Sequence, residues 1–229
     1  MSSVLSLEGR KQERLNSGLA DAITDRTFNA VMCGTLLWGF LVNAFMVAYL
    51  AEPIMSFVAG MRPLFFWIGY AVLGFAGILL AQLSDKPAVS FLGFNLLVAP
   101  MGVFLCLIVP SMPAAIVSKA LLLTGLVTAT MILLGMIRPQ LFLGLGRTLF
   151  VALLAGVVVE LVATFLFHYY GSAFDWLFVI IFSGYIGFDI ARSQAYPKTV
   201  DNAIDCALDI YLDIINLFIR ILSILSRRD

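Results

Sequence analysis

Residues 27–51 read TFNAVMCGTLLWGFLVNAFMVAYLA and carry no charged side chain over 25 residues. A helix needs about 20 mainly apolar residues to cross the roughly 30 Å hydrocarbon layer of a bilayer. A membrane β-strand would instead alternate apolar and polar residues, which this stretch does not do. The stretch predicts a membrane-spanning helix and an all-α integral membrane protein in a lipid bilayer.

The composition of the whole chain agrees with this prediction. Hydrophobic residues make up 62% and charged residues 12%, whereas soluble domains average about 45–50% and 25%. A soluble or disordered chain is therefore excluded. The formal net charge is zero, and because nucleic-acid binding needs a basic face, we expect no nucleic-acid partner.

Further apolar runs follow the first one along the chain. Charge-free runs cover residues 27–51, 63–84, 87–118 and 120–137. The third run is too long for one helix, and Pro110 and Pro113 divide it. Residues 148–168 and 176–191 each contain one acidic residue, and residues 202–225 contain several charges. The sequence predicts six spans and an unusual seventh.

The charges outside these runs predict the domain organisation and the orientation. Residues 1–26 are polar without a signal-peptide core and form a predicted cytoplasmic segment, and residues 27–229 form the membrane domain. A cytoplasmic N-terminus leaves only Arg62 and Lys119 on the far side before the C-terminal residues. The cytoplasmic side then receives Arg10, Lys11, Arg14, Arg26, Lys86, Arg138, Arg147, Arg192 and Lys198. A seventh crossing would place the C-terminus outside, and we favour it over a re-entrant last segment.

The sequence gives little support for an enzyme or a resident cofactor. Its three cysteines form no CxxC pair, it has one histidine, and the HExxH, GxSxG and phosphate-loop motifs are absent. An aspartyl intramembrane protease is the remaining enzymatic alternative. The Tyr-Asp and Gly-x-Gly-Asp motifs of the presenilin type are absent at the aspartates concerned, Asp189 and Asp213.

The last apolar segment carries a polar stripe. Asp205, Asp209 and Asp213 recur every four residues and are followed by Asn216 and Arg220. At 100° per residue these side chains share one side of a helix. Because ionisable groups in hydrocarbon cost several kcal/mol, this side should face protein or a wet cavity.

Two of the acidic residues are expected to meet. Asp189 lies near the cytoplasmic end of the sixth span, and the next segment re-enters from the same side, which brings Asp213 toward it. Two carboxyl groups at a site of low dielectric cannot both ionise cheaply, so they would share one proton. Such a pair is a proton-sensitive latch, and its oxygens also suit Ca²⁺.

Each remaining polar residue has a structural alternative. Asp205 is expected to cap the helix in solvent, and Asp209 either does the same or lines an ion pathway. Glu160, near mid-membrane, is either a gate residue or a buried hydrogen bonder. Arg220 is a candidate ion-pair partner of Asp213, and His168 is expected at the membrane interface.

The segment ALDIYLDIINLFIRILSIL, residues 207–225, closely resembles the last-helix signature of the transmembrane Bax-inhibitor-motif family. YIGFD, residues 185–189, resembles the preceding aspartate element of that family, and the spacing of 24 between Asp189 and Asp213 also fits. The resemblance implies a seven-helix bundle with the C-terminal helix at its centre. It further implies a pH-sensitive calcium leak in which Asp189 and Asp213 share a proton at the cytoplasmic mouth.

Two function classes follow from these observations. The first is a calcium leak with Asp189 and Asp213 as pH sensor and candidate Ca²⁺ ligands, and with Asp209 and Glu160 as candidate pathway residues. The second is a non-conducting interaction protein that modulates a membrane-bound AAA protease, as the resemblance implies for some bacterial members, or a cell-death or stress partner. The compact chain favours the bacterial inner membrane over an organelle membrane.

Overall fold

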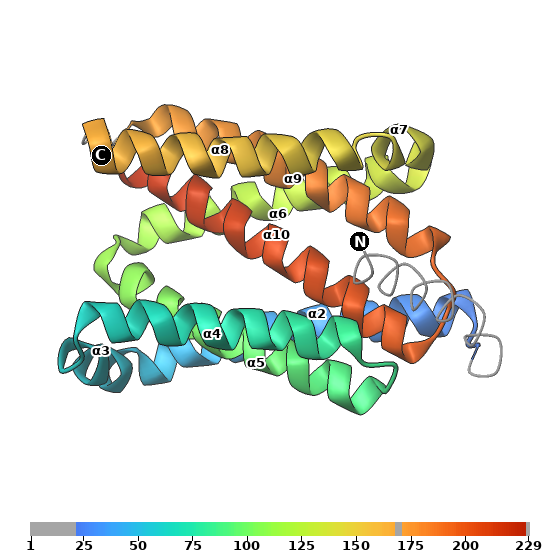
Figure 1. The fold of residues 1–229 in the computed structure, drawn as a ribbon, viewed down its shortest axis with the longest axis horizontal. Coiled ribbons are helices and arrows are strands. Elements are labelled where there is room, and N and C mark those ends of the chain that lie inside the picture. Colours follow the sequence, from blue (N-terminus) through green and yellow to red (C-terminus); the bar gives the residue numbers. More distant parts are fainter. Residues whose placement is uncertain (1–21, 168–170, 228–229) are drawn as a thin grey trace, which may run out of the picture. The chain divides into compact units, whose positions relative to one another are not determined.

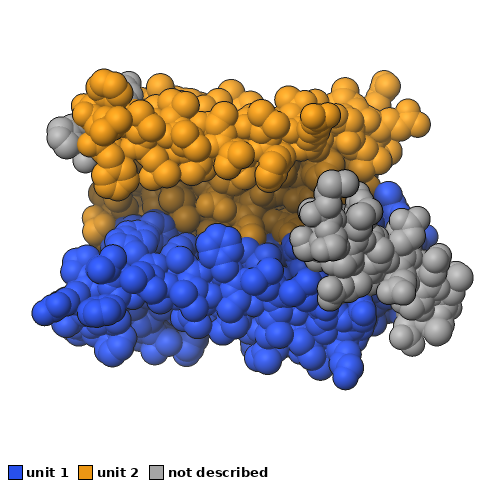
Figure 2. Space-filling view, in the orientation of Figure 1, with its two compact units in different colours: residues 1–110, 195–208 blue, residues 111–194, 209–229 orange. Residues whose placement is uncertain are grey.

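The structure is a computed structural model that describes residues 22–167 and 171–227. Within these ranges the chain folds into helices and contains no strand (Figure 1). Residues 1–21 of the predicted N-terminal segment, and His168, lie outside the described residues. The chain divides into two compact units (Figure 2). Unit 1 comprises Met1–Pro110 and Ala195–Leu208, and unit 2 comprises Ser111–Gln194 and Asp209–Asp229.

Unit 1 holds the first three predicted spans. Its elements are α2 (Asp25–Phe45), the π-helical turn η1 (Met46–Leu50), α3 (Ala51–Ala59), α4 (Pro63–Leu83) and α5 (Pro87–Ile108). The Thr24 side chain caps α2, because its Oγ1 accepts a hydrogen bond of 3.2 Å from the backbone N–H of Thr27. Pro63 and Pro87 each begin a helix, at a position where a missing N–H has no helical partner to lose.

Unit 2 holds the next three predicted spans. Its elements are α6 (Ala114–Ile137), the short α7 (Pro139–Leu143), α8 (Gly146–Phe167) and α9 (Ser172–Ala195). The 3₁₀ turn η2 (Val109–Ser111) comes between α5 and α6 in the sequence. The predicted division at Pro110 and Pro113 is confirmed, since α5 ends at Ile108 and α6 begins at Ala114.

The last helix, α10 (Val200–Ser226), contributes residues to both units. Every residue of α10 is buried or half-buried, although its sequence carries several charges. By contrast, most residues of α8 are exposed. The polar stripe of α10 is therefore covered by the protein, as its charges require.

The connection between α9 and α10 is fastened to the start of α2 within unit 1. The Lys198 carbonyl accepts a 2.8 Å hydrogen bond from the backbone N–H of Ile23, and the Lys198 Nζ lies 4.4 Å from the centroid of the Phe28 ring. Burial lowers the pKa of the Lys198 ammonium, and the nearby Asp25 and Cys206 oppose this shift.

Six helical segments are long and apolar enough to cross a membrane. They are Asp25–Ala59, Pro63–Leu83, Pro87–Ser111, Ala114–Ile137, Gly146–Phe167 and Ser172–Ala195. The six predicted spans are thus confirmed by length and composition. Helix α10 is not among them, because its charges exceed what such a segment tolerates.

The first span is longer than the sequence predicts. The apolar run ends at Ala51, but the helical segment continues to Ala59 through the π-helical turn. Leu50 departs from helical geometry, with φ −114° and ψ 1°, and a new helix, α3, starts after it. Pro53 then lies in the first turn of α3, where it breaks no backbone hydrogen bond, so it does not end the segment.

Candidate functional site

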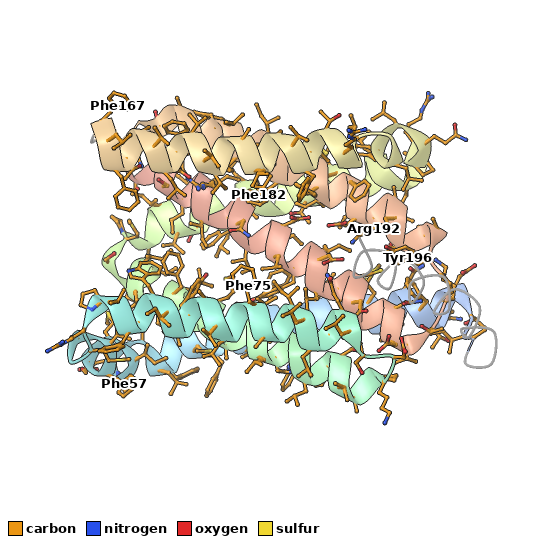
Figure 3. All side chains as sticks on the ribbon, viewed as in Figure 1. Phe57, Phe75, Phe167, Phe182, Arg192 and Tyr196 are labelled. Atoms are coloured by element: carbon orange, nitrogen blue, oxygen red, sulfur yellow. The ribbon has the colours of Figure 1, made fainter. Side chains whose placement is uncertain are left out.

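Four charged side chains gather where α9 and the unit 2 part of α10 meet. We call Asp189, Arg192, Asp209 and Asp213 the aspartate cluster. The Arg192 Nη2 lies 3.0 Å from Asp189 Oδ1 and also donates a hydrogen bond to Asp209 Oδ2. The carboxyl groups of Asp189 and Asp213 are close enough to interact with each other. One guanidinium and a pair of acids therefore join the two helices. Arg192 is labelled in Figure 3.

The two paired acids are the most enclosed members of the aspartate cluster. Asp189 is 5% exposed and Asp213 7% exposed. The Oδ2 atom of Asp213 is buried and has no hydrogen-bond partner among the described residues. The aspartate cluster contains three carboxyl groups and one arginine. When all of them are ionised, the cluster carries an excess of negative charge that protons or cations can compensate.

The packing around Asp189 leaves α9 little freedom. A Cβ atom built on Gly135 of α6 would lie 2.6 Å from the carbonyl oxygen of Gly187, so the backbones of α6 and α9 touch there. Two residues from Asp189, the Gly187 Cα also faces the Phe142 ring of α7. The Arg192 guanidinium lies 5.3 Å from the centroid of the Phe188 ring. These contacts fix the turn of α9 that carries Asp189 and Arg192.

A second charged group lies further along α10, and we call it the Arg220 cluster. The Arg220 guanidinium donates two hydrogen bonds to Glu160 of α8, of 2.6 and 2.8 Å, and one of 3.1 Å to Asp175 of α9. Asp175 also accepts a 2.9 Å hydrogen bond from the Ser223 hydroxyl and lies 3.4 Å from Arg227 Nη2. Two acids thus face two arginines, and the charges balance.

The structure places the candidate residues as follows. Asp189, Asp213 and Asp209 come together, but whether they sense pH stays a prediction. Glu160 lies in the Arg220 cluster, where it accepts hydrogen bonds from Arg220. The expected pairing of Arg220 with Asp213 is not found, because Arg220 pairs with Glu160 and Asp175. Seven residues place the two side chains on the same side of α10 but about 10 Å apart along its axis, so each one meets different neighbours.

The sequence does not reveal the role of three charged residues of these clusters, Arg192, Asp175 and Arg227. Arg227 follows the predicted last segment, which ends at residue 225. The sequence analysis assigns Arg192 only to the cytoplasmic side, whereas in the structure Arg192 contacts Asp189 and Asp209. Its position three residues after Asp189 is the signal that could have revealed it. Asp175 was overlooked because it lies just before the predicted sixth span. In the structure it is inside α9, and its side chain is 4% exposed.

The oxygen atoms of the aspartate cluster do not form a suitable site for a resident Ca²⁺ ion. Such an ion takes six to eight oxygen ligands, and no group of three or more His, Cys, Asp or Glu side chains in the described ranges could hold a metal. The arginine also competes for the oxygens of Asp189 and Asp209.

The sequence is similar to those of known proteins. Residues 21–229 match the model of a protein family described as "Inhibitor of apoptosis-promoting Bax1". The chain belongs to this family. The resemblance seen in residues 185–189 and 207–225 is thereby confirmed, and the match includes both clusters of this Bax inhibitor family member.

Two bacterial relatives of this Bax inhibitor family member are inner membrane proteins. The chain is 27% identical over 219 residues to the inner membrane protein YbhL of Escherichia coli K12, and this covers 89% of the chain and 92% of the relative. The YbhL protein of Escherichia coli O6:H1 gives the same values. With its six apolar helices, the chain is a multi-pass membrane protein.

Proposed function

We propose that this Bax inhibitor family member is a pH-sensitive calcium leak, gated where α9 and α10 meet. The observation that supports this proposal most directly is the contact between Asp189 and Asp213 inside the membrane domain. Buried ionisable groups in a membrane protein are costly and commonly mark ion or proton pathways.

The gate works through one shared proton. While the proton is present, the Asp189 and Asp213 carboxyl groups attract each other and hold α9 against α10. When the pH rises and the proton leaves, two carboxylates face each other away from water and repel. The positive charge of Arg192 offsets part of this repulsion, but Arg192 also forms an ion pair with Asp209. High pH therefore weakens the contact, and low pH strengthens it.

The charge balance favours a cation as the transported ion. The aspartate cluster has more acids than bases, so a hard cation such as Ca²⁺ is attracted to it once the helices separate. Asp209 is the next acid along α10 and is a candidate pathway residue. Glu160 is a weaker candidate, because its carboxylate is already paired with Arg220.

We further propose seven crossings with the N-terminus in the cytoplasm and α10 at the centre of the bundle. The burial of every residue of α10 supports a central position. The distribution of basic residues supports the orientation, which places the aspartate cluster toward the cytoplasmic side. The inner-membrane relatives support a location in the bacterial inner membrane.

Calcium flux into liposomes that carry the purified full chain tests the leak. The external pH is stepped between about 6 and 8, the range in which a buried carboxyl pair can lose its proton. We expect flux above that of empty vesicles, changing with pH in the native chain. Asp213→Asn cannot release the proton and should remove most of this pH dependence.

The control for this experiment is Asp85→Asn, which changes an exposed aspartate of unit 1 outside the clusters. Its flux should follow the native pH curve. Flux no greater than that of empty vesicles at every pH would refute the leak. A native chain and an Asp213→Asn variant with the same pH curve would refute the proposed sensor.

A second candidate function is that of a non-conducting regulator of another membrane protein. The family description supports it, because it names inhibition of a protein rather than transport. A membrane-bound AAA protease or a cell-death or stress protein is the expected class of partner. Deleting residues 1–20 should then reduce regulation of the partner in cells, while liposome flux, if there is any, stays unchanged.

A further inference from the structure

Unit 1 contains an apolar groove that neither cluster uses. It lies among η1, α3, α4 and α5, and its volume of about 400 Å³ is within the roughly 300–1,000 Å³ of small-ligand sites. Its walls include Phe57 of α3, Phe65 and Tyr70 of α4, and Pro100 of α5. We call it the α3–α4 groove. Its lining is almost entirely apolar.

Local backbone features create this groove. After the π-helical turn, Leu50 leaves helical geometry, and the helix α3 starts after it. Gly69 of α4 lines the groove, and a Cβ atom built there would meet no atom within 4 Å. The missing side chain at Gly69 therefore leaves real space between the helices, which the neighbouring side chains do not fill.

The surroundings of the groove determine what can occupy it. Its walls belong to segments long and apolar enough to span the bilayer, so acyl chains are the molecules that meet it. Phe57, which is labelled in Figure 3, is 71% exposed, and Phe65 is 58% exposed. An acyl chain would cover this apolar surface without leaving a polar group unpaired.

A basic residue lies next to a lining residue of the groove in the sequence. Arg62 directly follows Met61, which lines the groove, and it is exposed with no ion pair among the described residues. It also precedes α4, whose first turn carries the positive end of the helix dipole and has no side-chain cap. A guanidinium beside a helix N-terminus favours a phosphate group.

We propose that the α3–α4 groove binds an anionic phospholipid, with one acyl chain along Gly69 and the phosphate at Arg62. This proposal does not depend on the calcium leak. The groove supplies the apolar contact, and Arg62 distinguishes acidic from zwitterionic headgroups.

Lipid binding to the full chain in neutral detergent tests the proposal, measured by native mass spectrometry with phosphatidylglycerol and phosphatidylcholine as probes. Gly69→Leu should fill the groove and reduce the occupancy of both lipids. Arg62→Gln should remove the preference for phosphatidylglycerol over phosphatidylcholine. We expect this preference to be about fivefold in the native chain, the contribution of one basic side chain near an anionic lipid surface. Val103→Phe, which fills the groove from α5, is a second groove variant should Gly69→Leu fail to fold.

Matched controls are available in the same chain. Gly34→Leu also adds a side chain at a helical glycine whose Cβ would meet nothing within 4 Å, and Gly34 does not line the groove. Lys119→Gln removes another exposed basic residue. Both controls should keep native occupancy and native preference.

Three results would overturn the proposal. Unchanged lipid occupancy in both groove variants would show that the lipid binds elsewhere. An unchanged preference in Arg62→Gln would remove the headgroup contact. A dimer that Gly69→Leu abolishes, with lipid occupancy unchanged, would assign the groove to a second copy of the chain.

Discussion

At the scale of single residues, Arg192 governs the balance of the aspartate cluster. It is the arginine that contacts both Asp189 and Asp209, and its neighbour on the other side is the Phe188 ring. A positive charge beside a carboxyl pair favours the ionised form. The proposed latch therefore depends on Arg192 for the pH at which it opens.

The first prediction concerns this residue. Arg192→Gln removes the positive charge, so the shared proton should be held to a higher pH. We expect the midpoint of the flux–pH curve to move upward by about one unit. Liposome flux measures this, with Arg138→Gln as the control, since Arg138 is exposed and lies outside the cluster. A downward or absent shift would contradict the role given to Arg192.

The sequence predicts the meeting of Asp189 and Asp213 but not their full surroundings. Their encounter follows from a short connection between two consecutive helices, because re-entry from the same side brings the nearby turns together. The partner of Arg220 could not be predicted in this way. The partner depends on how α8 and α9 are rotated about their axes. Because α8 has similar apolar residues on all sides, its sequence does not reveal which side faces α10.

At the scale of helices, the close approach of α6 and α9 positions the aspartate cluster. The two backbones meet at Gly135 and Gly187, and Gly187 lies two residues before Asp189. Glycines at a helix contact allow such an approach in lipid. The sequence does not identify the two glycines that meet, because small residues recur throughout this chain.

The second prediction tests this contact with two substitutions in α6. Gly135→Ala places a Cβ 2.6 Å from a carbonyl oxygen of α9 and should lower the stability by about 1–3 kcal/mol. Gly125→Ala meets no atom within 4 Å and should raise it by up to about 1 kcal/mol through helix propensity. Thermal unfolding in detergent measures both. Changes of the same sign would argue against the close contact.

The third prediction concerns the connection of α10 to α8 and α9 through the Arg220 cluster. Arg220→Met leaves Glu160 and Asp175 without this cation and should cost about 3 kcal/mol. Combining it with Glu160→Gln should cost less than the sum of the single changes, by about 1–3 kcal/mol. A double-mutant cycle of unfolding free energies measures the difference. Additive effects would show that the Arg220–Glu160 pair contributes no coupling.

The helix boundaries show what an apolar run can predict and where it fails. Prolines at positions 110 and 113 divided one long run correctly, because both lie where a helix cannot continue. Pro53 did not end the first span, since a π-helical turn placed it at the start of α3. The sequence does not predict the short helix α7, because five residues are too few to show a periodic pattern.

At the scale of the whole molecule, the proposed orientation in the membrane can be tested by labelling. The fourth prediction uses single cysteines in a cysteine-free chain and a membrane-impermeant thiol reagent added to intact cells. Lys119→Cys and Asp229→Cys should react, whereas Lys86→Cys should react only after lysis. Reversed labelling would contradict the cytoplasmic N-terminus. Protection of position 229 alone would show that the last segment is re-entrant.

The charges of α10 also constrain how the protein is made. Six helices are apolar enough to partition into lipid one at a time as the ribosome releases them, but α10 is not one of them. The charged partners of Asp209 and Arg220 belong to α8 and α9, which precede α10 in the chain. If α10 crosses the membrane as we propose, it should insert by docking onto α8 and α9, and a chain that lacks either helix should leave α10 outside the bilayer as a substrate for quality control.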